Sequence, residues 1–153
     1  MKLPNQTRGP VVLSKIDHAA NMSEETLAFT ATIEINGLRG TVRNDGRGGA
    51  CLVTPWKGVG EAVETYAKTL PPAPCEWDPE HPIAYTADFL LAEMVGQARE
   101  EYEHRKMGKK GFTHYVVVGT RVVYFRGAPD ETALERTLGA EVAKTAKVCP
   151  IPV

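Results

Sequence analysis

Apolar and polar residues alternate in the first third of the chain. From Leu27 to Ile35 every second residue is apolar, while threonine and glutamate fill most of the positions between them. This period of two is typical of a strand with one buried face. Asn36-Gly37 follows directly, and this dipeptide favours a two-residue hairpin turn because both positions tolerate a positive φ. The pattern predicts a first β-hairpin with strands near 26–35 and 38–43, and with Ile33 and Val42 facing the core.

A second hairpin is predicted between Phe112 and Arg126. Two short apolar runs, Tyr115–Val118 and Val122–Phe125, flank Gly119-Thr120. Glycine at the first turn position suits a tight turn of type II′. Both runs are apolar on both faces, which is typical of central strands that are covered on each side. We therefore expect this hairpin to lie in the middle of the sheet.

Three segments repeat apolar residues at helical spacing. The first runs from Gly60 to Leu70, and the second runs from Thr86 to Lys106. The third begins after Asp130, whose carboxylate suits a helix N-cap, and repeats leucine or valine every fourth residue as far as Val142. This order of strands and helices is typical of an α+β protein. We predict a single domain over residues 1–153, with an antiparallel sheet of about five strands built from the two hairpins and three helices packed on it.

The charge balance argues against two kinds of function. The 153 residues include 18 basic and 19 acidic ones, for a formal net charge of −1. A general nucleic-acid-binding protein is usually strongly basic, and a mimic of nucleic acid needs a large acidic excess. Hydrophobic residues make up 42% of the chain, and no stretch approaches the roughly 20 apolar residues of a membrane span. We expect neither general nucleic-acid binding nor a membrane protein.

Cysteine usage indicates a reducing compartment. The three cysteines, Cys51, Cys75 and Cys149, are an odd number, and no two of them have the close spacing of metal ligands. The segment from Met1 to Arg8 lacks the apolar run that a signal peptide needs. We expect free thiols, no intramolecular disulfide and a cytoplasmic location.

A glycine-rich loop follows the first hairpin and is the main candidate site. Consecutive backbone N–H groups in such a loop can converge on an anion, and an arginine can hold a phosphate or carboxylate with two hydrogen bonds. The candidate ligand-binding residues are Arg43, Asn44, Asp45, Gly46, Arg47, Gly48 and Gly49. The alternative is that Asp45-Gly46 is one more hairpin turn, leading to a strand at 50–53, because glycines also form turns and bulges.

The same region resembles a known group of proteins. Ser23-Glu24-Glu25-Thr26, the hairpin and the loop Asn44-Asp45-Gly46-Arg47-Gly48-Gly49 are similar to the opening of a small family of uncharacterised bacterial and phage proteins. In that family the loop reads S-N-D-G-x-G-G, and Arg43 stands where the family tends to have serine. The likeness covers about the first third of the chain. It implies a characteristic loop and an origin in a mobile element, and it implies no activity.

The end of the long predicted helix carries another candidate. Glu100 and His104 stand four residues apart and can share one helix face, as two metal ligands would. Two ligands do not make a metal site, and acids followed by bases are typical of an exposed helix end. We expect no metal, with Met94 and Tyr102 facing the core and with Glu100 and His104 facing solvent. The basic cluster from Arg105 to Lys110 is either a solvated helix end, which the pattern favours, or a group of side chains that binds phosphate.

No catalytic constellation stands out in the sequence. Cys51 and His114 are a nucleophile–base pair on predicted strands, but nothing in the sequence brings them together. Two tryptophans lie in predicted loops, where such residues either anchor an interface or cover the edge of a core. The secondary candidate contacts are Trp56, Lys57, Trp77, Arg105, Lys109 and Lys110. We expect no cofactor and no enzyme activity.

Two functions remain open from the sequence alone. The first is a small binding protein, encoded by a phage or mobile element, that sequesters an anionic or nucleotide-like ligand through the glycine-rich loop and its arginines. The second is a protein–protein inhibitor, of the anti-defence or anti-CRISPR type, that blocks a host protein complex. The sequence identifies neither the ligand nor the partner, and it leaves open whether the chain forms an oligomer.

Overall fold

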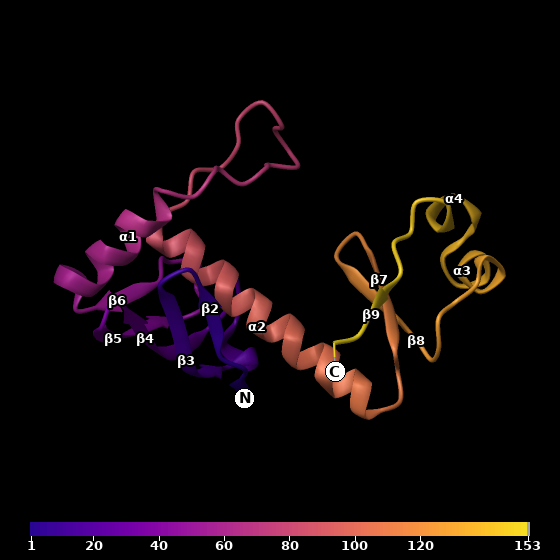
Figure 1. Cartoon of the computed structure of the whole chain (residues 1–153), viewed down its shortest axis with the longest axis horizontal. Coiled ribbons are helices and arrows are strands. Elements are labelled where there is room, and N and C mark those ends of the chain that lie inside the picture. The colour runs from indigo at the N-terminus through magenta and orange to yellow at the C-terminus, as the bar shows by residue number, and fades with distance from the viewer. Residues whose placement is uncertain (153) are drawn as a thin grey trace. The chain divides into compact units, whose positions relative to one another are not determined.

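The computed structural model describes residues 1–152 and shows an α+β protein, as predicted (Figure 1). The chain divides into two compact units, Met1–Glu100 and Glu101–Val153. The boundary falls inside the long helix α2 (Ala87–Lys109), and each unit has its own antiparallel sheet. The two predicted hairpins therefore lie in different sheets, and the prediction of one sheet built from both is wrong.

A six-stranded antiparallel sheet forms the frame of the first unit. Its strands are β1 (Lys2–Leu3), β2 (Gln6–Arg8), β3 (Val11–His18), β4 (Phe29–Ile35), β5 (Leu38–Asn44) and β6 (Leu52–Thr54). The order across the sheet is β1-β3-β4-β5-β6, and β2 also pairs with β3. The helical segments are η1 (Ala20–Met22), η2 (Trp56–Gly60), α1 (Glu61–Ala67) and the first part of α2.

The first predicted hairpin is confirmed as β4 and β5. The two-residue turn sets Ile35 opposite Leu38. Asn36 and Gly37 have φ values of 51° and 79°, and such a turn needs a positive φ at both positions. Ile33 and Val42 are buried, as predicted. Pattern and turn chemistry thus agree on one register.

Three strands at the start of the chain were not predicted. In β3 the pairing register shifts between Ser14 and Asp17, and Lys15 has a φ of 50°. A bulge of this kind adds a residue and resets the alternation of faces. Leu13 and Ile16 therefore both face the core although they are three residues apart. β1 and β2 are too short to show any period.

Helices cover one face of this sheet. Figure 1 shows α1 and the first part of α2 on the same side of the strands. The α2 residues buried there are Ala87, Leu90, Leu91, Met94, Val95 and Ala98. The other face carries the polar positions of the alternating pattern and is mostly exposed. In one row across that open face, Thr30 of β4 pairs with Arg43 of β5, and Arg43 pairs with Leu52 of β6.

The second unit has a three-stranded sheet in the order β8-β7-β9. Its elements are β7 (His114–Val118), β8 (Arg121–Phe125), α3 (Glu131–Leu138), α4 (Ala140–Ala143) and β9 (Cys149–Pro150). β7 and β8 are the second predicted hairpin, and Gly119 has a φ of 62° in its turn. The predicted cover on both faces is wrong, because Val116 is buried but Val117 is 58% exposed.

The three predicted helices are present, with one change in the third. Asp130 caps α3 by accepting a hydrogen bond from the N–H of Ala133 at 2.8 Å. Gly139 then adopts a φ of 87° and ends the helix, so that Val142 belongs to the separate short helix α4. Glycine commonly ends a helix in this way because it lacks a Cβ.

The end of α2 differs from the prediction. Met94 is buried as expected, and Tyr102 is half-buried. His104 is only partly exposed, because its ring stacks on Tyr115 at a centroid distance of 4.1 Å and its Nδ1 lies 3.2 Å from the hydroxyl of Tyr124. An imidazole has a flat face and a polar edge, and here Tyr115 packs against the face while the Tyr124 hydroxyl lies at the edge.

All three cysteines are free thiols, as predicted. Cys51 is buried, whereas Cys75 and Cys149 are half-buried. Within residues 1–152 no helix combines the length and apolar character that crossing a membrane requires.

Candidate functional site

Asn44 fixes the glycine-rich loop at the end of β5. Its Oδ1 accepts hydrogen bonds from the Thr26 hydroxyl and from the N–H of Gly46, each at 2.8 Å. Its Nδ2 donates to the carbonyl of Gly49 at 2.9 Å and contacts the Sγ of Cys51 at 3.7 Å. One buried amide side chain thus connects both ends of the loop to its surroundings.

The segment 23–26 is bonded to the same loop. The carbonyl of Gly46 accepts hydrogen bonds from the three consecutive N–H groups of residues 24–26, at 3.0, 2.9 and 3.3 Å. Gly46 has a φ of 82°, and a Cβ at this position would collide with the carbonyl of Met22. The two motifs that carried the family resemblance, Ser23–Thr26 and Asn44–Gly49, therefore form one hydrogen-bonded structure.

Three backbone N–H groups of the loop bind oxygens of the chain itself. The N–H of Gly46 binds Asn44 Oδ1, and the N–H of Arg47 binds Asp45 Oδ1 at 3.0 Å. The N–H of Gly48 binds the hydroxyl of Thr26 at 3.3 Å. An anion at these three donors would have to displace existing bonds. A ligand in this region would therefore bind to side chains beside the loop and not to these N–H groups.

One side of the loop opens into a cleft of about 500 Å³, which we call the Arg43 cleft. Its lining residues are Phe29, Thr30, Arg43, Asn44, Asp45, Gly49, Ala50 and Leu52. Leu52 is 49% exposed beside Arg43. Within residues 1–152 the Arg43 guanidinium makes no hydrogen bond or ion pair, whereas Arg39 on the same strand pairs with Glu34 at 3.7 Å. The cleft thus combines an uncommitted cation with apolar surface.

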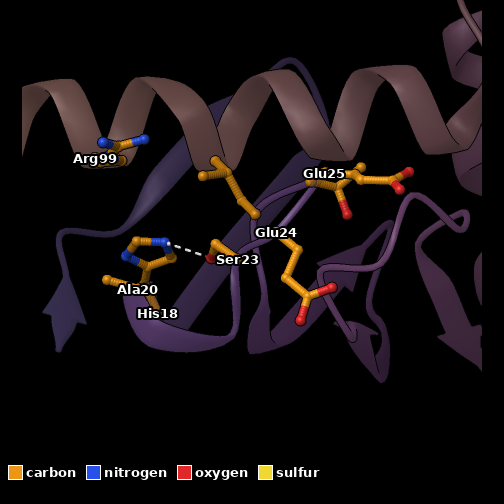
Figure 2. A pocket seen from close by; sticks show the side chains of 8 residues that line it. His18, Ala20, Ser23, Glu24, Glu25 and Arg99 are labelled. Atoms are coloured by element: carbon orange, nitrogen blue, oxygen red, sulfur yellow. Dashed lines mark hydrogen bonds between the residues drawn. The ribbon is translucent and has the colours of Figure 1, made fainter.

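The segment 23–26 lines a second cleft of about 350 Å³, which we call the His18 cleft (Figure 2). His18 comes from the end of β3 and is only 3% exposed. Burial lowers the pKa of its imidazole, and the charges of Arg99 and of the N-terminal ammonium lower it further. Figure 2 shows Arg99 on α2 facing the side of the cleft on which His18 lies.

Ser23 connects His18 to the loop region. Its Oγ lies 3.3 Å from His18 Nε2, donates to the carbonyl of Ala19 at 3.0 Å and accepts from the N–H of Ala28 at 2.9 Å. A Ser23 hydroxyl that donates to Ala19 can accept from an Nε2–H of His18, and this assignment of the tautomer satisfies all three contacts.

Cys51 is placed for packing and not for nucleophilic attack. Burial raises the pKa of its thiol to about 12, so the thiolate is scarce at neutral pH. Its N–H donates to Asp88 Oδ1 at 2.6 Å, which fastens the chain after the loop to the start of α2. His114, the base considered with it, belongs to the second unit and bonds through Nδ1 to the Thr113 hydroxyl at 2.8 Å.

None of the remaining predicted contacts lines the Arg43 cleft or the His18 cleft. Trp56 and Lys57 belong to η2, and Trp77 lies in the segment between α1 and α2. Arg105 forms an ion pair with Glu101, and Lys109 and Lys110 are exposed at the end of α2. Across residues 1–152 no group of three or more histidine, cysteine or acidic side chains is arranged to hold a metal ion.

The sequence reasoning missed the His18 cleft. Its residues come from β3, from the segment after η1 and from α2, and no motif links these parts of the chain. His18 is the last residue of β3, a bulged strand that was not predicted, so its burial could not be read from the pattern. Comparison with protein-family models, with curated proteins and with solved structures finds no match to this chain.

Proposed function

We propose that this chain is a non-enzymatic binding protein that holds an anionic, nucleotide-like ligand in the Arg43 cleft. The observation that carries the proposal is the Arg43 guanidinium, which has no partner within residues 1–152 and lines a cleft beside the exposed Leu52. A guanidinium matches the geometry of phosphate and carboxylate oxygens, while apolar surface suits a nucleobase or another uncharged part.

The loop supports this function as a scaffold. Hydrogen bonds connect residues 44–49 to one another and to the segment 23–26, so one wall of the cleft is in place before a ligand arrives. A preformed site loses less conformational entropy on binding. In a protein encoded by a phage or mobile element and located in the cytoplasm, as the resemblance and the cysteines led us to expect, such a site would sequester the ligand.

Thermal shift against a panel of nucleotides tests the proposal. A ligand that binds only the native state raises stability by RT ln(1 + [L]/Kd), about 2.7 kcal/mol at a hundredfold excess over Kd. We expect at least one nucleotide to raise the melting temperature of the wild type, and Arg43→Ala to abolish the shift. Arg39→Ala, on the same strand but paired with Glu34, is the control and should keep it. If Arg43→Ala responds like the wild type, the Arg43 cleft is not the site.

A second candidate function rests on the segment between α1 and α2. Trp77 is 94% exposed there, and its acidic neighbours Glu76 and Asp78 are exposed as well. Ala73 and Ile83 bond to each other through both N–H groups at 2.8 Å and close the base of the segment. An exposed tryptophan in a segment whose ends are hydrogen-bonded together is typical of a residue that anchors a protein interface. This favours the protein–protein inhibitor, with a partner whose apolar pocket has a basic rim.

A further inference from the structure

We infer that the His18 cleft is a second anion-binding site, in which a small oxyanion or carboxylate group pairs with Arg99 and makes His18 easier to protonate. This site goes beyond the proposed function, because it shares no lining residue with the Arg43 cleft. Its volume of about 350 Å³ accepts a small anionic metabolite.

The geometry leaves Arg99 available for an anion. Within residues 1–152 its guanidinium makes no hydrogen bond or ion pair, although acidic side chains line the same cleft. Figure 2 shows the side chains of Glu24 and Glu25 on the far side of the cleft from Arg99. The end of the cleft between Arg99 and His18 is therefore positive and lacks a counter-ion from the chain.

The surroundings of His18 oppose its protonation. Its Nε2 lies 3.3 Å from the Ser23 hydroxyl, and its buried Nδ1 has no hydrogen-bond partner in the described chain. A second proton would have to sit on Nδ1, away from water and close to two cationic groups, Arg99 from α2 and the N-terminal ammonium next to β1. The N-terminal ammonium is paired with Asp17 at 3.1 Å, which reduces its effect on His18. Among the described residues Arg99 has no such partner, and the carboxylates of Glu24 and Glu25 lie on the far side of the cleft.

An anion bound to Arg99 weakens the repulsion between the Arg99 guanidinium and a protonated His18. Its negative charge offsets that of the guanidinium, so the repulsion felt by a protonated His18 falls and the pKa of the imidazole rises. Thermodynamic linkage makes the effect reciprocal, because a protonated His18 must then raise the affinity for the anion by the same factor. The site therefore binds anions more tightly as the pH falls.

Titration of His18 by NMR, with sulfate as the probe, tests the inference on the full chain. Sulfate keeps its charge across the range in which histidine titrates, and chloride at equal ionic strength controls for screening. We expect sulfate, but not chloride, to raise the pKa of His18 by about half a unit or more. Arg99→Gln should remove the sulfate effect and raise the pKa of His18 in the absence of sulfate, because a nearby positive charge is lost.

Two control variants separate this site from the Arg43 cleft. Arg39→Gln, paired with Glu34 elsewhere on the sheet, should leave the sulfate effect unchanged. Arg43→Ala should also leave it unchanged, even if it abolishes nucleotide binding. The inference is overturned if sulfate and chloride act equally, or if Arg99→Gln keeps the full sulfate effect.

Discussion

At the scale of the residue, the side chain of Asn44 determines the conformation of the glycine-rich loop. Its oxygen accepts two hydrogen bonds, and its NH2 group contacts the Gly49 carbonyl and the Cys51 sulfur. Aspartate has almost the same shape, but it would offer no donor to these two acceptors. A buried asparagine therefore explains why the loop can be rigid although three of its six residues are glycine.

The glycines of the first unit are expected to differ in their response to alanine. Gly37, Gly46 and Gly48 all have positive φ, at 79°, 82° and 87°. At Gly37 an added Cβ meets nothing, so Gly37→Ala reports the backbone cost alone, about 1 kcal/mol. At Gly48 it meets only the flexible end of Glu25, but at Gly46 it meets the Met22 carbonyl.

We therefore expect Gly46→Ala to lower the free energy of unfolding by roughly 3 kcal/mol, since backbone must move. Gly48→Ala should cost only slightly more than Gly37→Ala. Urea denaturation of the three variants measures the series. Equal costs at Gly46 and Gly37 would mean that the loop does not lie against the Met22 carbonyl.

His18 gives the folded chain a defined pH dependence. Its pKa is lowered in the native state, so between that value and about 6.5 the unfolded chain binds a proton that the native chain does not. The contribution of His18 to the free energy of unfolding is therefore fully present above about pH 6.5, and it falls as the pH drops below that value. Denaturation at pH 7.5 and 5.5 should show a smaller loss for His18→Gln than for the wild type. An unchanged loss in the variant would show that His18 is not the group responsible.

At the scale of elements, the predictions succeeded where local chemistry fixes the outcome. The first hairpin has a strict period and an Asn36-Gly37 turn, so its register followed from the sequence. β3 was missed because its bulge places Leu13 and Ile16 on one face at a spacing of three. The apolar runs of β7 and β8 predicted strands correctly, but such runs do not say which sheet they join.

The segment between α1 and α2 presents Trp77 without using it in the fold. Trp77→Ala should therefore change the free energy of unfolding by less than about 0.5 kcal/mol. Trp56 is the matched comparison, because it is 49% exposed and its ring lies against Gly60, so Trp56→Ala should cost about 1–2 kcal/mol.

Fluorescence quenching checks the exposure of Trp77 directly. In Trp56→Phe, Trp77 is the remaining tryptophan, and acrylamide should quench it nearly as well as it quenches free tryptophan. Strong protection would indicate that Trp77 is covered, for instance in an oligomer.

At the scale of the whole molecule, the number of folding units stays a prediction. The sequence led us to expect one domain, and the structure has two compact units whose boundary lies between residues 100 and 101, inside α2. No linker composition marks this point, because a helix continues through it. We expect a single cooperative transition in calorimetry, with equal calorimetric and van't Hoff enthalpies, since unfolding either unit would shorten the shared helix. Two separate transitions would contradict the single domain.

The candidate site could be predicted only in part. The Arg43–Gly49 segment was found from its glycines and arginines, and four of its residues line the Arg43 cleft. The partners of the loop amides could be predicted only in part. Asn44 and Asp45 each bind an N–H group two residues further on, which is a local turn pattern, whereas the Gly48 N–H binds Thr26, 22 residues away. Arg99 and His18 are 81 positions apart, so no local pattern could connect them.

The central claim is that ligand recognition uses Arg43 while the amides of the loop stay bonded within the chain. A titration of the ¹⁵N-labelled protein with the nucleotide that stabilises it most tests this claim directly. We predict that the largest chemical-shift changes affect the Arg43 side chain and the amides of residues 29–30, 43–45 and 49–52. The amides of residues 46–48 should keep their protection from hydrogen exchange. Two results would contradict the claim. One is that the ligand shifts the amide signals of residues 46–48 or removes their protection from exchange, and the other is that the Arg43 side-chain signals do not change.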